Sequence, residues 1–198
     1  NADGQAVSEA FTDSVRLYAE RAYEGNDDEG RTMLVDMLNY GAAAQEFFGY
    51  ETEQLANAGL TEEQQAMATE EALCENKLTD AYNYRGTRLA LESSISMQVG
   101  FKNVKDAAYA VYTFTDHNGK EWSVTVDAAD FIDGYGVELS AIVLADARAL
   151  VTCTVYNESD EVLASVTDSV ESYVARSGDD ALFTCIMKFA DSAYNFFH

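Results

Sequence analysis

Two stretches of this chain, one near each end, carry the same arrangement of residues. The first reads RTMLVDMLNYGAAAQEFFGY over residues 31–50, and the second reads ALFTCIMKFADSAYNFFH over residues 181–198. At one constant offset, the matched pairs are Leu34/Phe183, Met37/Ile186, Leu38/Met187, Tyr40/Phe189, Ala44/Ala193, Phe47/Phe196 and Phe48/Phe197. Just upstream, TDSV-x-x-Y-x-x-R occurs at residues 12–21 and again at 167–176. This recurrence indicates an internal duplication, and the alternative is two unrelated amphipathic segments.

Each copy predicts a pair of helices joined by a loop, over residues 13–48 and 168–197. In the first copy the apolar and small residues recur every three or four positions, which is the spacing of one helix face; they are Leu34, Met37, Leu38, Gly41, Ala44, Gln45 and Phe48. A glycine inside a helix costs about 1 kcal/mol relative to alanine, so Gly41 predicts a close approach by another segment. Because Phe48 and Phe197 are matched, both are expected to be buried.

The helix ends follow from local signals. Thr12 or Asp13 is expected to cap the first helix, and Gly25 and Gly49 to end the first two. Thr61 and Gln64 form a capping box for a short helix near residues 61–68. Asp168, paired with Glu171, is expected to begin the third helix, which stops near Gly178, and the fourth begins after Asp179.

From Thr87 the apolar residues alternate with polar ones, which is the period of a β-strand. The turn signal Asp116-His-Asn-Gly119 predicts a hairpin, and seven or eight strands with no long helix between them predict an antiparallel sandwich. The predicted fold class is therefore α+β, an antiparallel β-sandwich flanked by two duplicated α-helical hairpins. The expected division is a helical hairpin region over 1–68, a linker over 69–85, and a unit over 86–198 that joins the sandwich (86–167) to the second hairpin (168–198). Residues 1–12 mirror 156–167, so 1–68 is interpreted as the tail of a preceding repeat.

The run MLNYGAAAQEFFGY, followed by LANAGLTEEQ, resembles a repeated module of large secreted or cell-surface proteins of anaerobic Gram-positive, Clostridia-like bacteria. The resemblance implies a β-rich half, a short helix and then an LLNYGAAAQ-type helix. It also implies an extracellular or cell-surface location beside adhesion, carbohydrate-active or dockerin modules of a longer chain. The second copy departs from the pattern, with KFADSAYNFF in place of NYGAAAQEFF and Asp191 where the first copy has Ala42. No catalytic residue is carried over from this family.

The composition excludes some classes of partner. With 12 basic and 35 acidic residues, the net charge is −23, which disfavours nucleic acid and anionic membranes. No apolar run reaches the roughly 18 residues that a membrane span needs, so no membrane insertion is expected. The acidic surface is interpreted as a solubility feature, with cation binding as the alternative.

The cysteines and histidines of the chain indicate no metal site or catalytic site. Cys74, Cys153 and Cys185 fit no metal motif and predict no disulfide framework, and Cys153 lies at strand spacing among valines, which predicts burial. The two histidines, His117 and His198, lie in a predicted turn and at the last position. The chain has no GxSxG, phosphate loop or HExxH motif.

Two groups of residues are candidate sites. Trp122, Tyr112 and Tyr135 lie in the β region, where exposed rings could stack on a sugar, although Trp122 and Tyr109 could equally belong to the core. Asp127, Asp130 and Asp133 loosely resemble a cation-binding loop without matching a calcium consensus, and the alternative is a solvated loop. No cofactor is expected apart from calcium at these aspartates.

The sequence therefore favours a non-catalytic module of a bacterial secreted or cell-surface protein, a spacer or an adhesion unit that contacts a glycan or a protein. The alternative is a carbohydrate-active hydrolase with an acidic pair, whose support is the abundance of carboxylates.

Overall fold

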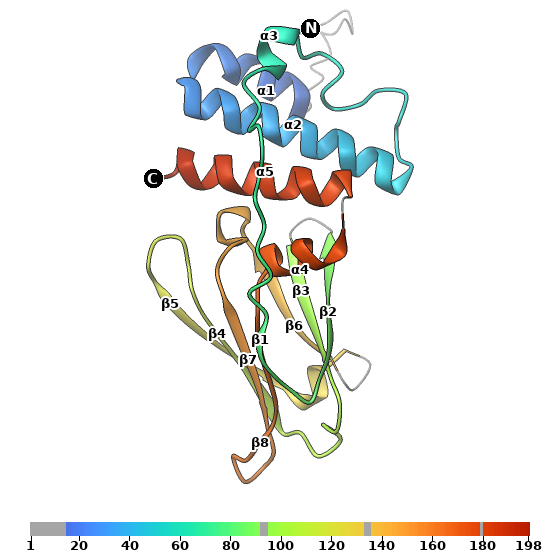
Figure 1. The fold of residues 1–198 in the computed structure, drawn as a ribbon, viewed down its shortest axis with the longest axis vertical. Helices are drawn as coiled ribbons and strands as arrows, with labels where there is room; N and C mark the ends of the chain where they lie inside the picture. The colour runs from blue at the N-terminus through green and yellow to red at the C-terminus, as the bar shows by residue number, and fades with distance from the viewer. Residues whose placement is uncertain (1–14, 92–94, 133–135, 179) are drawn as a thin grey trace, which may run out of the picture. The chain divides into compact units, whose positions relative to one another are not determined.

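The computed structural model describes residues 15–91, 95–132, 136–178 and 180–198 (Figure 1). The predicted caps Thr12 and Asp13 lie outside these residues. The chain forms two compact units, residues 1–68 and residues 69–198. Its class is α+β, with helices in both units and two antiparallel sheets in the second.

The first unit contains α1 (Val15–Gly25), α2 (Asp28–Phe48) and α3 (Glu62–Gln65). Asp27 caps α2 by accepting a hydrogen bond from the Gly30 amide at 3.0 Å. Gly49 ends α2 with a φ of 65°, a left-handed conformation that favours glycine. The capping box of Thr61 and Gln64 is formed, so the predictions for Gly49 and for α3 are confirmed.

A loop covers one face of α2 up to Gln45. The Gln45 side chain donates to the carbonyls of Glu51 and Gln54 and accepts from the Ala56 amide at 2.7 Å. A Cβ placed on Gly41 would lie 3.0 Å from the Cβ of Ala56, so the predicted close approach at Gly41 is confirmed. The core beneath contains Ala19, Leu34 and Leu38, with Ala22, Tyr23, Met37, Ala56 and Leu60 packed against it.

Phe48 is not part of this core. It is 59% exposed, so the prediction that it is buried is wrong. The physical reason is that Gly49 turns the chain directly after Phe48, and the returning loop covers the helix at Gly41 and Gln45 instead.

The second unit contains two antiparallel sheets. The strands are β1 (Thr79–Tyr82), β2 (Tyr84–Leu91), β3 (Ile95–Phe101), β4 (Tyr109–Thr115), β5 (Glu121–Asp127), β6 (Gly136–Ile142), β7 (Val151–Tyr156) and β8 (Val162–Asp168). One sheet has the order β1-β8-β7-β4-β5 and the other the order β2-β3-β6. β1 lies in the segment that the sequence assigned to a linker. The 3₁₀ turns η1 (Ala128–Asp130) and η2 (Leu144–Asp146) lie between strands.

Both sheets contribute to a single hydrophobic core. Alternate residues of each strand point to the same side, so the inward set of one strand is every second residue. The buried cluster contains Met97, Val99, Phe101, Val104, Ala110, Tyr112, Phe131, Val137, Leu139, Val151, Cys153, Val155, Ala164 and Val166. The predicted burial of Cys153 is confirmed, since it is 1% exposed.

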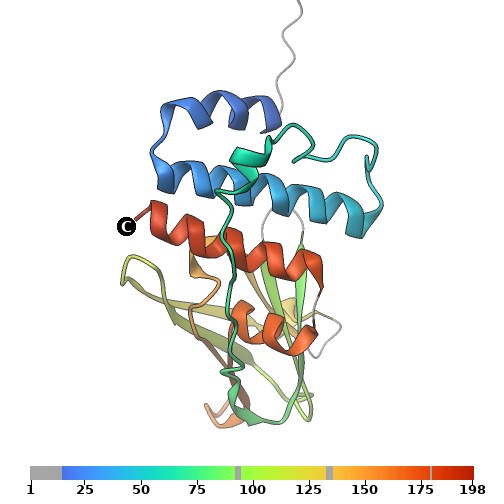
Figure 2. The same ribbon diagram turned by 45° about the horizontal axis from the view of Figure 1, so that its top comes forward.

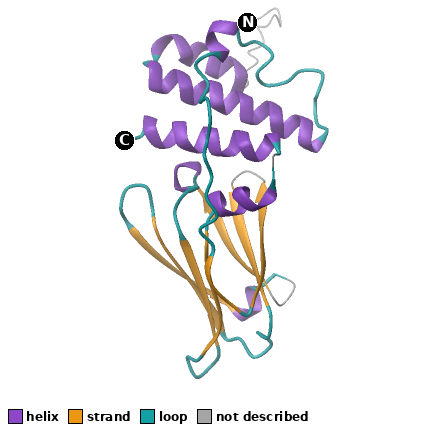
Figure 3. Ribbon diagram, in the orientation of Figure 1, coloured by secondary structure: helices purple, strands orange, loops and turns teal. Residues whose placement is uncertain are grey.

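The second unit also contains α4 (Val170–Ser177) and α5 (Ala181–Phe196), which lie at one end of its strands (Figures 1 and 3). Ser169, rather than Asp168, caps α4, because its side chain accepts from the Ser172 amide at 3.0 Å. Asp180 caps α5. Phe197 follows α5 and is 63% exposed, so its predicted burial is wrong; it lies past Ala193, the last buried residue of α5.

Glu171 does not complete a capping box. Its carboxylate is 1% exposed and binds Lys77 at 3.0 Å, Arg148 at 2.6 Å and the Glu75 amide at 3.2 Å. Arg148 also binds Asp191 of α5 through two nitrogens, at 2.7 and 2.8 Å. These contacts attach the segment before β1 to α4 and, through Arg148, to α5; in Figure 2 this segment crosses α5 and passes the beginning of α4. We call Lys77, Arg148, Glu171 and Asp191 the ion cluster.

The two helix pairs differ in length: 11 and 21 residues in the first unit, and 8 and 16 in the second. The duplication therefore stays a prediction from sequence. Within the described residues, no helix combines the length and the apolar character that crossing a membrane requires.

Candidate functional site

Of the three aromatic residues proposed as ligand contacts, the structure describes Tyr112, which lies in the core, and Trp122, which lies on an edge strand. Tyr112 has no exposed surface and donates its hydroxyl proton to the Val137 carbonyl at 2.7 Å, so it is a core residue and cannot stack on a ligand. Its inward position follows from strand alternation, and burial raises its pKa well above the ordinary value. Tyr135 lies outside the described residues.

Trp122 is 41% exposed, but its ring already contacts other side chains of the protein. It lies on β5, the edge strand next to β4, and Tyr112 of β4 already contacts β6 of the smaller sheet. β5 therefore lies beyond the last strand of the smaller sheet, which explains the exposure. The Trp122 ring carries the Lys120 ammonium 3.5 Å from its centroid, and its Nε1 donates to Asp116 at 2.8 Å. These contacts stabilise the hairpin and leave one ring face less available to a sugar.

Of the three aspartates proposed for calcium, the structure describes Asp127 and Asp130. Asp127 ends β5, Asp130 ends η1, and both are exposed, while Asp133 lies outside the described residues. In the part of the chain that is described, no three His, Cys, Asp or Glu side chains are grouped so that they could hold a metal ion. Calcium at this loop stays a prediction.

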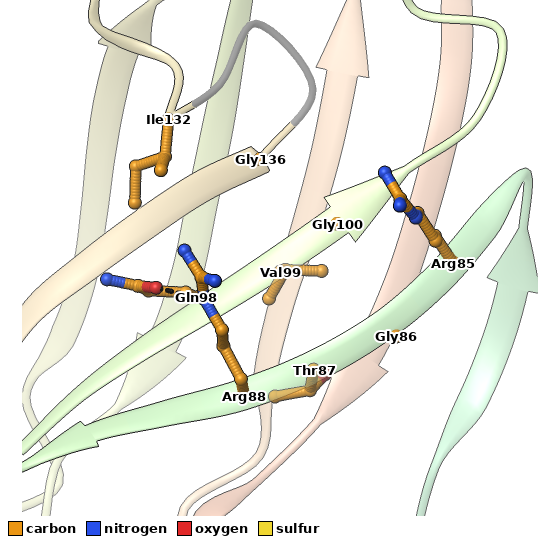
Figure 4. Close-up of a pocket in the computed structure, with 9 residues that line it drawn as sticks. All are labelled: Arg85, Gly86, Thr87, Arg88, Gln98, Val99, Gly100, Ile132 and Gly136. Carbon is orange, nitrogen blue, oxygen red and sulfur yellow. Dashed lines mark hydrogen bonds between the residues drawn. The ribbon is translucent and has the colours of Figure 1, made fainter.

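A hollow of about 340 Å³ lies on the outer face of the three-stranded sheet. We call it the glycine hollow, because its floor is a row of three glycines, one from each strand. Gly86 pairs with Gly100, and Gly100 pairs with Gly136. Val99 and Phe101 on either side of Gly100 point into the core, so Gly100 points outward. The row forms a trough because side chains are missing at aligned positions (Figure 4).

The next outward row along the same strands is polar and linked by hydrogen bonds. Arg88 pairs with Gln98, and Gln98 pairs with Glu138. The Arg88 Nε donates to the Gln98 side-chain oxygen, and the Gln98 side-chain nitrogen donates to Glu138 at 3.0 Å. This row holds the Arg88 guanidinium beside the trough, where Figure 4 shows it turned toward Gln98.

Arg85 stands on the other side of Gly86 along β2, at an irregularity in the pairing between Tyr84 and Gly86 (Figure 4). It has no hydrogen bond or ion pair with any described residue. Ile132 supplies an apolar edge to the hollow. The site thus combines a floor of three glycines, two guanidinium groups and the aliphatic contact of Ile132, and the aliphatic part of Arg85 lies beside the floor at Gly100.

A second hollow, of about 730 Å³, lies near η2 and α5, and we call it the His117 hollow. The His117 Nδ1 binds Asp146 at 2.8 Å and its Nε2 binds the Asn118 side chain at 2.9 Å. The ring of His198 lies 5.5 Å from that of His117, so the fold brings both histidines together. The Trp122 indole N–H, followed by the Lys120 amide, holds the pKa of Asp116 below its ordinary value.

The polar groups of the His117 hollow mostly bind each other. Asp146 accepts from the ring and the amide of His117, and Asp191 accepts from Arg148, whose pKa is raised by that contact. A carboxyl that serves as a general acid needs a pKa raised toward the working pH. The pKa of Asp116 is shifted in the opposite direction, and the mutual contacts of the other polar groups favour a structural role for this hollow.

Sequence reasoning missed the glycine hollow. A glycine within a strand pattern is a known sign of a bulge or a close approach, and Gly86, Gly100 and Gly136 each gave that sign. Their alignment depends on the register of three strands, which no single segment encodes.

Comparisons with protein-family models, with curated proteins and with solved structures found no match to this chain.

Proposed function

We propose that this chain is a non-catalytic module of a bacterial secreted or cell-surface protein, which serves as a spacer or as an adhesion unit that contacts a glycan or another protein. The observation that carries the binding role is the glycine hollow, a concave site on a hydrogen-bonded sheet with two guanidinium groups at its side. Its volume lies near the lower end of the usual range for small-molecule sites, roughly 300–1,000 Å³. The extracellular setting rests on the resemblance of residues 32–60 to modules of secreted proteins.

The chemistry of the site supports binding rather than turnover. The glycine hollow is lined by arginine, glutamine, threonine, glycine and aliphatic residues. Hydrolysis of a glycoside usually needs two carboxyl groups on opposite sides of the bond. Glu138, the acid nearest in the polar row, is bound to Gln98.

We also propose the finer description of the fold, a β-sandwich flanked by two helical hairpins that arose by duplication. The repeated TDSV-x-x-Y-x-x-R motif and the paired FF ends support it. An experimental structure in which Tyr18 and Tyr173 occupy equivalent places after superposition of the two helix pairs would support the duplication, and unrelated places would contradict it.

A glycan array tests the binding role. The full chain is applied to plant and host glycans, with and without calcium, beside the variants Gly100→Val and Trp122→Ala. A Cβ on Gly100 would meet only ordinary contacts, the nearest being the Gly86 carbonyl at 3.5 Å, so valine should fill the hollow without unfolding the sheet. We expect binding that Gly100→Val abolishes and Trp122→Ala preserves.

The matched control is Gly25→Val, since a Cβ on Gly25 meets nothing within 4 Å and lies in the first unit. Binding lost in Trp122→Ala and kept in Gly100→Val would place the site at β5 instead. Turnover of any glycan would overturn the non-catalytic proposal, and no binding to any glycan would leave the role of spacer or protein contact.

A further inference from the structure

We propose that the glycine hollow recognises a carboxylate carried by a sugar-sized ligand, and that the guanidinium groups of Arg85 and Arg88 bind this carboxylate. The inference rests on the proposed function and names the class of ligand at the same site.

The first argument is the contrast among the four arginines of residues 69–198. Arg148 and Arg176 each bind carboxylates of the fold: Arg148 binds Asp191 and Glu171, and Arg176 binds Asp168 at 2.7 Å. Arg85 and Arg88 have no carboxylate within 4.0 Å among the described residues, although the whole chain carries 35 acidic residues. Among the described residues, these two guanidinium groups on an open face of a strongly acidic protein are therefore unmatched in charge.

The second argument is how Arg88 is held. It uses Nε to bind Gln98, which is itself fixed by Glu138. The two terminal nitrogens have no hydrogen-bond partner among the described residues, so they stay available to a ligand. Guanidinium groups bind carboxylates through two parallel N–H···O bonds, and a fixed side chain loses less rotamer entropy when it does so. The polar row thus orients an anion-binding group before any ligand arrives.

The third argument is the shape of the floor. Because Gly86, Gly100 and Gly136 are aligned across three strands, a flat group can lie directly on the backbone between the polar row and Ile132. A pyranose ring fits this description, with its C–H groups against Ile132 and its carboxylate toward the arginines. The net charge of −23 favours an anion with one charge over a phosphate with two, because each further charge is repelled by the whole molecule.

The test is calorimetric titration of the full chain with D-galacturonate, D-galactose, galactose 6-sulfate, inorganic phosphate and acetate. We expect galacturonate to bind most tightly, with galactose weaker by roughly tenfold to a hundredfold, the loss typical of a charge-assisted hydrogen bond. Acetate is expected to bind more weakly than galacturonate, because it lacks the ring that rests on the glycine row. Added salt should weaken galacturonate and leave galactose unchanged.

The variants Arg85→Gln and Arg88→Gln should each weaken galacturonate by roughly tenfold and leave galactose unchanged. Arg88→Lys keeps the charge and removes the planar pair of donors, so it should weaken galacturonate as well. Lys120→Gln is the matched control, since it removes the same charge on the other sheet and should have no effect. Thermal melts of each variant check that the fold is retained.

The outcomes separate this inference from the proposed function. Equal affinity for galactose and galacturonate, or tighter binding of sulfate or phosphate, would overturn the carboxylate assignment and leave a binding module. An equal loss in Lys120→Gln would show that net charge alone is responsible. Failure of all five probes would overturn the carboxylate assignment, and a negative glycan array beside it would overturn the glycan-binding role while leaving the role of spacer or protein contact.

Discussion

At the scale of single residues, Glu171 is the most consequential side chain of the second unit. It is almost fully buried, and it accepts from Lys77, Arg148 and the Glu75 amide. Truncation to alanine would remove the carboxylate that Lys77 and Arg148 share, while Asp191 would still bind Arg148. Removing one partner of a buried ion pair costs about 3–5 kcal/mol. Lys77 and Arg148 are each more than a third exposed, so water offsets part of the loss and we expect about 2–3 kcal/mol for Glu171→Ala.

Urea denaturation measures this loss. Glu158→Ala is the control, because Glu158 lies in the exposed turn between β7 and β8, and its effect should stay within about 0.5 kcal/mol. A loss below about 1 kcal/mol for Glu171→Ala would show that the ion cluster adds little to stability.

Because the Cys153 thiol is buried, we expect the free energy of unfolding to fall at alkaline pH. Burial raises the pKa of its thiol from 9.0 to about 12. Because the pKa is higher in the folded state, the unfolded chain loses its proton first, and the stability present below pH 9.0 is lost as pH rises from there through about 12. Each pH unit in this window costs at most about 1.4 kcal/mol from one group.

The measurement is a pair of urea titrations at about pH 8 and about pH 10.5. The native chain should lose about 1–2 kcal/mol more than Cys153→Ala over this interval, since the variant lacks the thiol. Equal losses in the two proteins would mean that the thiol does not control the decline. The pKa of Tyr112 is raised as well, mainly by burial, which is common to both proteins; the smaller part of that shift that comes from Cys153 is lost with the thiol and belongs to the measured difference.

At the scale of elements, Gln45 fixes the loop that follows α2. Three hydrogen bonds join its side chain to Glu51, Gln54 and Ala56, and the loop then contacts Gly41. We expect Gln45→Ala to speed hydrogen exchange at the Ala56 amide by roughly tenfold or more, because that amide loses its acceptor. Gln54→Ala, which keeps the backbone carbonyl that Gln45 uses, should leave the exchange unchanged. Unchanged protection in Gln45→Ala would show that packing alone holds the loop.

The elements also show which features local sequence encodes. Gly49 and the Thr61–Gln64 box were predicted correctly because each depends on residues within one turn of the chain. Asp168 was expected to cap α4, but its carboxylate instead binds Thr87 and Arg176, so Ser169 takes the cap. The contact with Thr87, which is distant in the sequence, thus helps to determine which residue caps α4.

The candidate site was beyond prediction for a related reason. The alternation near Gly100 was visible, so the strand and its inward residues could be predicted. Whether Gly100 faces Gly86 and Gly136 depends on pairing with strands up to 36 positions away, as the register Gly100↔Gly136 shows. A slip of one residue would have moved every one of these positions to the opposite face.

At the scale of the whole molecule, the division into two compact units predicts that residues 69–198 fold without residues 1–68. The core shared by the two sheets is made entirely of residues from this unit, as is the ion cluster. The fragment 69–198 should therefore melt in one cooperative transition by circular dichroism, with dispersed amide signals by NMR. A fragment without a cooperative transition would show that the first unit is needed for folding.

The ion cluster also determines how this unit would respond to a pulling force. β1 and β8 are antiparallel and Thr79 pairs with Thr167, so the chain enters β1 beside the place where it leaves β8. Tension applied across these two points would break the hydrogen bonds between β1 and β8 one after another. It would not load many of them at the same time, as shear along the strands does. Glu171 follows β8 and binds Lys77 and the Glu75 amide in the segment just before β1. These bonds would therefore bear the force before the ladder of β1 and β8 does. In the proposed role of an adhesion unit, the contacts of Glu171 would therefore contribute to the force at which β1 separates from β8.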